Sequence, residues 1–188
     1  FNNDIFGLLI FPLLFSLAGA VISTFIVIKN AGRLGIIDDP AKRAHPAKLH
    51  QKPIPRGGGL GLFAAILLGA IVFLPVDSRL AGILFGASFV VAIGFLDDSG
   101  SLNPYLRLGV QFLAAGAVVL SGIGISFVTN PLGGLIHFDL VTSAAFTFVW
   151  IVFLMNAVNW SSGVDGQLSG FTGIAALTIA LLSLKFSA

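Results

Sequence analysis

Apolar residues in this chain fall into six long runs, which short polar segments separate. A helix needs roughly 20 mainly apolar residues to cross a bilayer, and the runs approach that length with their flanks. The alternation that is typical of membrane β-barrels is absent, so the runs predict an all-α, polytopic transmembrane helical bundle. The predicted spans comprise residues 5–28, 60–74, 80–95, 106–123, 140–155 and 171–186, and the shorter ones are expected to extend into 57–59 or 157–158.

The composition agrees with a lipid environment. Of the 188 residues, 56% are hydrophobic and 10% are charged, and the mean hydropathy is +1.02. Soluble domains carry about 25% charged residues. The chain has no cysteine, which excludes disulfides and thiolate metal sites. It begins at Phe1 and ends directly after an apolar run, so we expect residues 1–188 to be a single integral membrane domain, the N-terminal part of a longer protein.

Basic residues indicate how the spans are oriented. Seven of the ten lysines and arginines lie between residues 29 and 56. Short basic loops stay in the cytoplasm, so this loop is expected inside, together with 96–105 and 156–170. The segment 124–139 then falls outside, and its Asn-Pro and Gly-Gly pairs predict a hairpin over 125–138. In this orientation three polar clusters all lie on the cytoplasmic face.

The first polar cluster is the basic loop itself. Its prolines favour an extended path, and Gly57, Gly58 and Gly59 then open a helix. Backbone amides at a glycine-rich helix start, beside Arg56, form an anion site that suits a diphosphate or a lipid phosphate. The alternative is an electrostatic anchor on anionic lipid headgroups. A nucleic-acid interface is excluded, because the loop is a short tether rather than a broad patch.

Asp97 and Asp98 form the second cluster, at the inner end of the third predicted span. Acids at a membrane boundary are functional candidates. Paired carboxylates suit Mg²⁺, which prefers oxygen ligands and binds phosphates. Arg107 and Gln111 follow one helical turn apart, on one face of the fourth span. The alternative is a pair of solvated charges at a helix end.

The third cluster begins where the fifth predicted span ends. Asn156 and Asn159 share a helix face, and Gly163 and Gly166 are expected to break the helix and present Asp165. Amides and a carboxylate at membrane depth need polar partners. A substrate or metal site would supply such partners, and so would a hydrogen-bond network between helices.

Together the three clusters resemble the motifs of the polyprenyl-phosphate N-acetylhexosamine-1-phosphate transferases, glycosyltransferase family 4. That family carries D-x-P-x-x-R-x-x-H and P-x-P-R-G-G, then G-x-x-D-D, then N-x-x-N-x-x-D-G-x-D-G. Order and spacing agree along essentially the whole chain. The matching residues are Asp38, Pro40, Arg43, His45 or a nearby histidine, Pro55 to Gly58, Gly94 to Asp98, and Asn156 to Gly166.

The resemblance implies a bacterial inner-membrane enzyme with roughly ten to eleven spans, about six of them in this chain, and cytoplasmic active-site loops. It implies transfer of a sugar-1-phosphate from a UDP-N-acetylhexosamine to undecaprenyl phosphate, with release of UMP and with Mg²⁺ or Mn²⁺ as cofactor. Such transfer initiates cell-wall or surface polysaccharide synthesis. A homodimer is an open alternative to a monomer.

Residue roles follow from the resemblance as expectations. Asp97, Asp98 and Asp165 are the expected catalytic and metal-binding residues, and the division of work between the first two is left open. The expected substrate-binding residues are Arg43, His45, Lys48, Arg56, Gly57, Gly58, Asn156 and Asn159.

Two departures from the family pattern matter. The first aspartate of D-G-x-D-G is Ser162 here, so only Asp165 is carried over from that motif. Family members also carry a later essential aspartate and a histidine-rich loop, which this chain does not reach. Arg56 resembles the branch that uses simple UDP-N-acetylhexosamines, whereas the muramoyl-pentapeptide branch typically reads P-T-M-G-G at this place.

Three alternatives remain at this point. The first is a phospho-N-acetylmuramoyl-pentapeptide transferase of the same family, and the second is an inactive scaffold that binds lipid phosphate. The third is a transporter that uses its acids as an ion path. A transporter should place ionisable groups near the middle of the membrane. The centres of the six predicted spans contain none, which favours an enzyme at the membrane surface.

Overall fold

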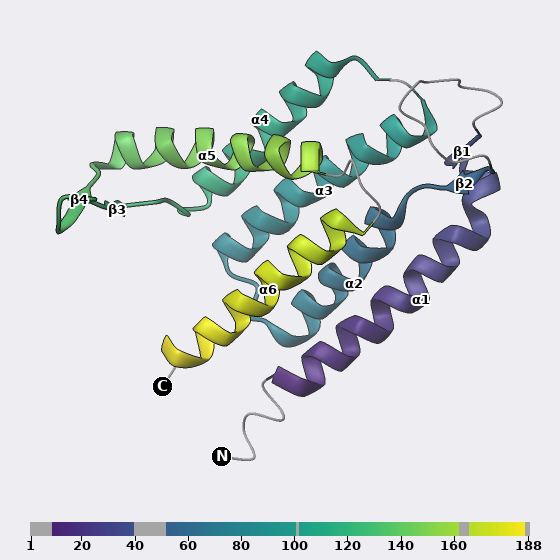
Figure 1. Cartoon of the computed structure of the whole chain (residues 1–188), viewed down its shortest axis with the longest axis horizontal. Helices are drawn as coiled ribbons and strands as arrows, with labels where there is room; N and C mark the ends of the chain where they lie inside the picture. Colours follow the sequence, from purple (N-terminus) through teal and green to yellow (C-terminus); the bar gives the residue numbers. More distant parts are fainter. Residues whose placement is uncertain (1–8, 40–51, 101, 162–165, 187–188) are drawn as a thin grey trace.

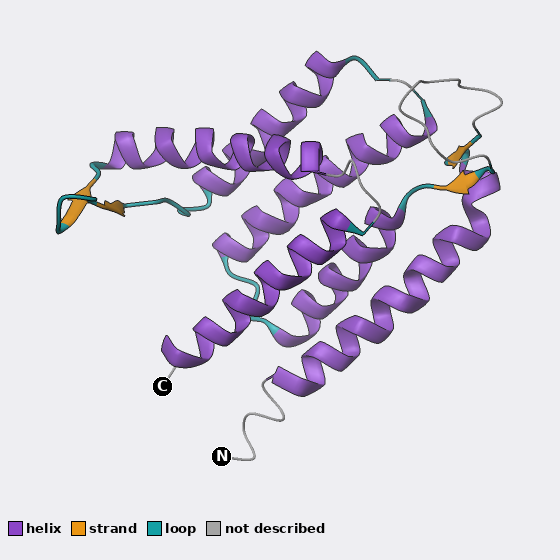
Figure 2. Cartoon of the chain, in the orientation of Figure 1, coloured by secondary structure: helices purple, strands orange, loops and turns teal. Residues whose placement is uncertain are grey.

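The computed structural model describes residues 9–39, 52–100, 102–161 and 166–186 (Figure 1). Within them the chain forms six helices and two small two-stranded antiparallel sheets (Figure 2). The elements are α1 (Phe11–Leu34), β1 (Ile37–Asp38), β2 (Ile54–Pro55), α2 (Gly58–Phe73), α3 (Ser78–Ser99), α4 (Pro104–Leu120), β3 (Phe127–Thr129), β4 (Leu135–His137), α5 (Leu140–Trp160) and α6 (Gln167–Phe186).

Each predicted span overlaps one of these helices, so the prediction of an all-α membrane bundle is confirmed. The first bounds were wrong: residues 5–28 were predicted, whereas α1 continues to Leu34 and takes in Lys29 and Arg33 of the expected loop. The helices α1, α3 and α5 are long and apolar enough to cross a membrane. The other three are shorter apolar helices, and the 16 residues of α2 give a length of about 24 Å against about 30 Å of hydrocarbon. The expected extensions are also found, because α2 begins at Gly58 and α5 continues through 157–158 to Trp160.

Polar caps explain why three of the helices begin where they do. The side chains of Asp77, Asn103 and Asp139 each accept a hydrogen bond from a backbone amide in the first turn of α3, α4 and α5, at 2.8 to 3.2 Å. The Thr142 hydroxyl also donates to Asp139 and holds the pKa of that exposed carboxyl below its ordinary value. These side chains supply hydrogen-bond acceptors for backbone amides in the first turn, which have no partner within the helix.

Small residues bring α1 and α2 into close contact along their length. Gly61, Ala65 and Gly69 follow one another at intervals of four on the face of α2 that meets α1. The Ser23 hydroxyl donates to the Gly61 carbonyl at 2.7 Å. A Cβ on Gly61 would lie 2.7 Å from backbone atoms of Thr24, so no side chain fits there. Such small-residue seams let membrane helices gain packing energy without a hydrophobic driving force.

A second close contact joins α3 to α4. A Cβ on Gly86 would lie 2.8 Å from the Ala114 carbonyl oxygen, and Gly82 lies against Ser121. Ala114 and Ala115 are fully buried in this contact. Since α3 and α4 are joined by a short connection, this seam fixes the start of α4 beside the end of α3.

The β1–β2 ladder positions the start of α2. Asp38 pairs with Ile54, and the Arg56 amide donates to the Ile36 carbonyl at 2.7 Å. Ile36 is completely buried beneath this ladder. Gly57 then adopts a φ of +87° and caps α2. The prediction of an extended path followed by a glycine-opened helix is therefore confirmed from Ile54 onward, whereas residues 40–51 of the loop lie outside the described residues.

The hairpin predicted over residues 125–138 is also confirmed. β3 pairs with β4 from Phe127 and His137 to Thr129 and Leu135, and the turn uses the left-handed Gly133 and Gly134. It lies at the N-terminal end of α5, which runs across the direction of α1, α2 and α3 (Figure 1).

Replacing Gly61 by alanine is expected to destabilise the α1–α2 pair, because the new Cβ would overlap Thr24. Overpacking costs about 1–3 kcal/mol. The thermal unfolding midpoint of the full-length protein in detergent should fall. Gly173→Ala on α6 is the matched control, because no atom lies within 4 Å of its added Cβ. Equal midpoints for the two variants would contradict the close contact.

Replacing Gly57 by alanine is expected to distort the junction between β2 and α2. The left-handed conformation costs an alanine about 1–2 kcal/mol, and the added Cβ would lie 2.6 Å from the buried Ile36 side chain. The same unfolding measurement should show a lower midpoint for Gly57→Ala. Gly59→Ala, in open space on the first turn of α2, should keep the wild-type midpoint or exceed it. A Gly57→Ala midpoint at the wild-type value would disprove the constraint.

Candidate active site

The acidic pair Asp97 and Asp98 lies in the last turn of α3, and each carboxylate meets an arginine. A guanidinium nitrogen of Arg107, in the first turn of α4, lies 3.1 Å from Asp97 Oδ2. The other oxygen of Asp97 accepts from the Leu102 amide at 3.2 Å. The short connection between α3 and α4 therefore folds back onto Asp97 and brings Arg107 beside it.

Arg56 links the second carboxylate of the pair to another acid. Its Nη2 lies 2.5 Å from Asp38 Oδ2 and its Nη1 lies 3.7 Å from Asp98 Oδ1. The Gly57 amide also donates to Asp98. The Asp38 side chain is only 6% exposed, against 40% for Arg56. A carboxylate so deeply buried needs a charged partner, and the guanidinium supplies two donors in a fixed geometry.

Asp38 was not among the predicted site residues. The sequence carried a signal for it, because it opens the D-x-P part of the family pattern. The sequence did not show that Asp38 contacts Arg56, 18 residues further along the chain. The two side chains meet because the β1–β2 ladder brings both residues to the start of α2.

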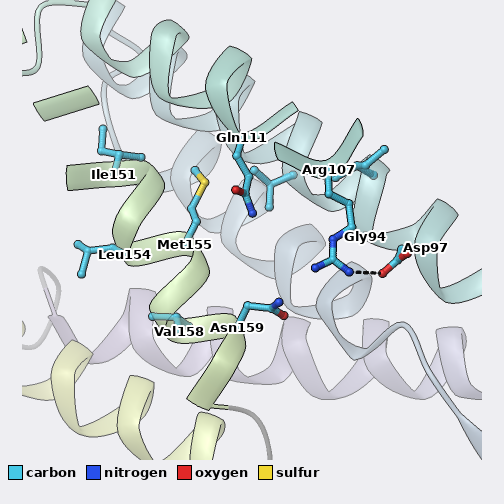
Figure 3. Close-up of a pocket in the computed structure, with 11 residues that line it drawn as sticks. Gly94, Asp97, Arg107, Gln111, Ile151, Leu154, Met155, Val158 and Asn159 are labelled. Carbon is cyan, nitrogen blue, oxygen red and sulfur yellow. Dashed lines mark hydrogen bonds and ion pairs between the residues drawn. The ribbon is translucent and has the colours of Figure 1, made fainter. Parts of the chain in front are cut away.

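A cavity of about 530 Å³ opens between α3, α4 and α5 (Figure 3). Its polar groups are Asp97, Arg107, Gln111 and Asn159, and Figure 3 shows these side chains directed toward one another across the cavity. The remaining lining is apolar and consists of Val90, Ile93, Gly94, Ile151, Leu154, Met155 and Val158. The cavity is thus amphiphilic, with ionic groups near the helix ends and hydrocarbon surface deeper in the bundle.

Asp98 faces a different space. A smaller pocket of about 200 Å³ lies beside β1 and includes Asp38, Asp39, Arg56 and Asp98 in its wall. Consecutive residues of a helix point about 100° apart, so the two neighbouring carboxylates open onto two separate pockets. Arg56 lies at the wall of one pocket and Arg107 at the wall of the other.

The two asparagines of the third cluster differ in their surroundings. The Asn156 amide bonds to the Gln111 side chain and to the Val152 carbonyl. Asn159 lies one turn further along α5 and lines the larger cavity. The predicted shared helix face is therefore present, with one amide in a contact between helices and the other at the cavity.

The structure brings together Asp97, Asp98, Arg56, Gly57 and Asn159 from the predicted set. Gly58 is the first residue of α2, and no atom lies within 4 Å of the Cβ that would be added there. The predicted residues Arg43, His45, Lys48 and Asp165 lie outside the described residues, as does Ser162.

Oxygen ligands for a hard cation are available from Asp97 and Asp98. Among the described residues no three His, Cys, Asp or Glu side chains gather closely enough to hold a metal ion alone. Mg²⁺ is commonly held by one or two carboxylates together with substrate phosphates and water. The chemistry of the acidic pair fits that mode of binding.

Comparison with known proteins places these residues in one family. The family model for glycosyl transferase family 4 matches residues 80–187. A probable undecaprenyl-phosphate N-acetylglucosaminyl 1-phosphate transferase of Bacillus subtilis is 32% identical over 172 residues, which cover 90% of this chain and 47% of the relative. A decaprenyl-phosphate N-acetylglucosaminephosphotransferase of Mycobacterium tuberculosis is 31% identical over 185 residues, which cover 90% of this chain and 45% of the relative.

The undecaprenyl-phosphate alpha-N-acetylglucosaminyl 1-phosphate transferase of Escherichia coli is 26% identical over 194 residues, with 96% of this chain and 46% of the relative covered. No solved structure matches the chain. The chain spans about half the length of these curated relatives. The family match covers more than half of the chain, including α3, α4 and α5 with the larger cavity between them. The chain therefore belongs to glycosyl transferase family 4.

Proposed function

We propose that the full-length protein transfers N-acetylhexosamine-1-phosphate from a UDP-sugar to a polyprenyl phosphate, with UMP as the second product. The observation that carries the proposal is the amphiphilic cavity, whose polar end holds Asp97 and Arg107 and whose deeper wall is apolar. A lipid phosphate has the same division into an anionic head and a hydrocarbon chain. The printed names of the curated relatives, which specify N-acetylglucosamine and undecaprenyl or decaprenyl phosphate, support this choice of substrates.

In the proposed reaction an oxygen of the acceptor phosphate attacks the sugar-bearing phosphorus of the donor. The bond from that phosphorus to the bridging oxygen of UMP breaks, and the lipid becomes a polyprenyl-diphospho-sugar. Both substrates are anionic and repel each other, so cationic groups must bring them together. Arg107 and Arg56 lie at the walls of the two pockets and are suited to contact phosphate oxygens, since a guanidinium binds phosphate through two parallel hydrogen bonds.

The acidic pair is the proposed site of a divalent cation, Mg²⁺ or Mn²⁺. Because Asp97 and Asp98 open onto different pockets, each would supply at most one oxygen ligand, and phosphate oxygens of the donor and water would supply the others. When bound, such an ion neutralises charge that develops on the transferring phosphoryl group. The arginine contacts keep both carboxylates in place at the end of α3.

A cytoplasmic location of this site is part of the proposal. The described site residues come from the C-terminal end of α3, the N-terminal end of α4 and the loop before α2. In an up-and-down bundle these ends lie on one side of the membrane. The basic loop before α2 favours the cytoplasmic side.

A single assay tests the proposed reaction. Full-length protein in detergent is mixed with UDP-N-acetylglucosamine and undecaprenyl phosphate, and UMP release is measured. We expect release that requires the lipid phosphate, ceases when EDTA removes divalent cations, and returns with added Mg²⁺. Release of UDP in place of UMP would contradict phosphoryl transfer, and activity that persists in EDTA would contradict the metal site.

Replacing Asp98 by asparagine is expected to lower UMP release by about 10²-fold or more, because the change removes a charged oxygen ligand and a partner of Arg56. Asp77→Asn is the matched control. It makes the same substitution at the opposite end of α3, where asparagine is an equally good helix cap. The control should insert normally and retain wild-type turnover. Near wild-type turnover in Asp98→Asn would exclude the carboxylate from the reaction.

A further inference from the structure

We infer that the side chains of Gln111 and Asn156 form a positioning pair, which fixes the inner end of α5 against α4 and thereby directs Asn159 into the active-site cavity. The inference rests on the proposed function, because it assigns Asn156 to holding the site rather than to binding substrate. The resemblance to the family had placed both asparagines among the substrate-binding residues.

The geometry of the pair is reciprocal. Asn156 Nδ2 donates to Gln111 Oε1 at 2.8 Å, and Gln111 Nε2 donates to Asn156 Oδ1 at 3.4 Å. The second hydrogen of the Asn156 amide goes to the Val152 carbonyl, one turn back on α5, at 2.9 Å. A primary amide has two donor hydrogens and one acceptor oxygen. Both hydrogens and the oxygen of Asn156 are therefore already engaged within the protein.

The pair lies where α4 and α5 would otherwise diverge. Figure 1 shows α5 crossing α4 at a wide angle, with the β3–β4 hairpin at its far end. Another contact between these helices joins Phe112 and Phe148, whose ring centres are 5.6 Å apart. A pair of rings tolerates sliding and rotation, whereas two hydrogen bonds between amides specify distance and orientation. The amide pair thus sets the rotation of α5 about its axis.

Rotation of α5 decides where Asn159 points. Asn159 lies three residues beyond Asn156, on the same helix face, and shares the cavity with Asp97 and Arg107 (Figure 3). A change of about 1 Å in a catalytic site can cost 10²-fold in rate. Without the pair, one amide group would face an apolar neighbour, and α5 would turn to find another partner.

The same residues supply an exchange experiment. Gln111→Asn combined with Asn156→Gln exchanges the two side chains, so the combined length is kept and the two amides meet one methylene nearer to α4. If the pair is a positioning device, each single alanine variant lowers kcat for UMP release by about 10- to 100-fold with a smaller change in KM. The exchanged double variant should recover most of the activity. The double alanine variant should lose no more than either single variant.

A substrate-binding role for Asn156 predicts the opposite pattern. The exchanged variant would then stay as inactive as Asn156→Ala, and the two alanine changes would multiply. Phe112→Leu is the control for a general loss of helix contact, because Phe112 follows Gln111 on α4 and packs against Phe148 of α5. It should lower the unfolding midpoint with little change in kcat. A Phe112→Leu variant that loses kcat as strongly as Gln111→Ala would overturn the specific role of the amides.

Thermal unfolding of the same variants in detergent separates this inference from the proposed function. The midpoints should show coupling, so that Gln111→Ala has little further effect once Asn156 is already alanine. If the wild-type protein releases no UMP, the proposed function fails, while coupled midpoints would still establish the pair as a link between α4 and α5. Additive midpoints would overturn the inference whatever the activity.

Discussion

Two carboxylates lie side by side at the end of the candidate membrane span α3, and the rest of the site depends on how their charge is balanced. Asp97 and Asp98 meet Arg107 and Arg56 respectively, and Arg56 also serves the buried Asp38. Exposed ion pairs add little to stability, but a charge at a lipid boundary is costly without a partner. The arginines therefore do more than stabilise: they place two guanidinium groups at the walls of two neighbouring pockets.

Close helix packing makes this balance possible. Gly86 has no side chain, so the backbone of Ala114 packs directly against α3. The two helices therefore lie close enough for Arg107 to contact Asp97. The seam at Gly61 likewise places α2 against α1. Because the β1–β2 ladder links these two helices at the same end of the bundle, Arg56 arrives beside Asp98. The glycines at these two helix contacts thus determine where the charged side chains lie.

The sequence predicted most of the fold because apolar runs and turn residues are local signals. The six helices, the β3–β4 hairpin and the glycine-opened start of α2 were all predicted from such signals. Pairing between distant residues was not predictable in this way. Nothing in the spacing shows that Asp38 meets Arg56, since that contact depends on a ladder closed over a long loop. The inclination of α5, and hence the contact between Asn156 and Gln111, depends equally on packing between separate helices.

The depth at which polar groups lie argues for chemistry at the membrane surface rather than transport through it. In the described helices the acids and Arg107 belong to the first or last turn, whereas an ion path needs ionisable groups near the middle of the bundle. The polar side chains that lie deeper beside the cavity are the neutral amides of Gln111 and Asn156, and they satisfy each other. Closing that pair leaves the deeper wall of the cavity apolar, suited to a hydrocarbon chain but not to an ion. The arrangement therefore combines an apolar wall with charged groups at the helix ends, which is the division that the proposed lipid-phosphate substrate requires.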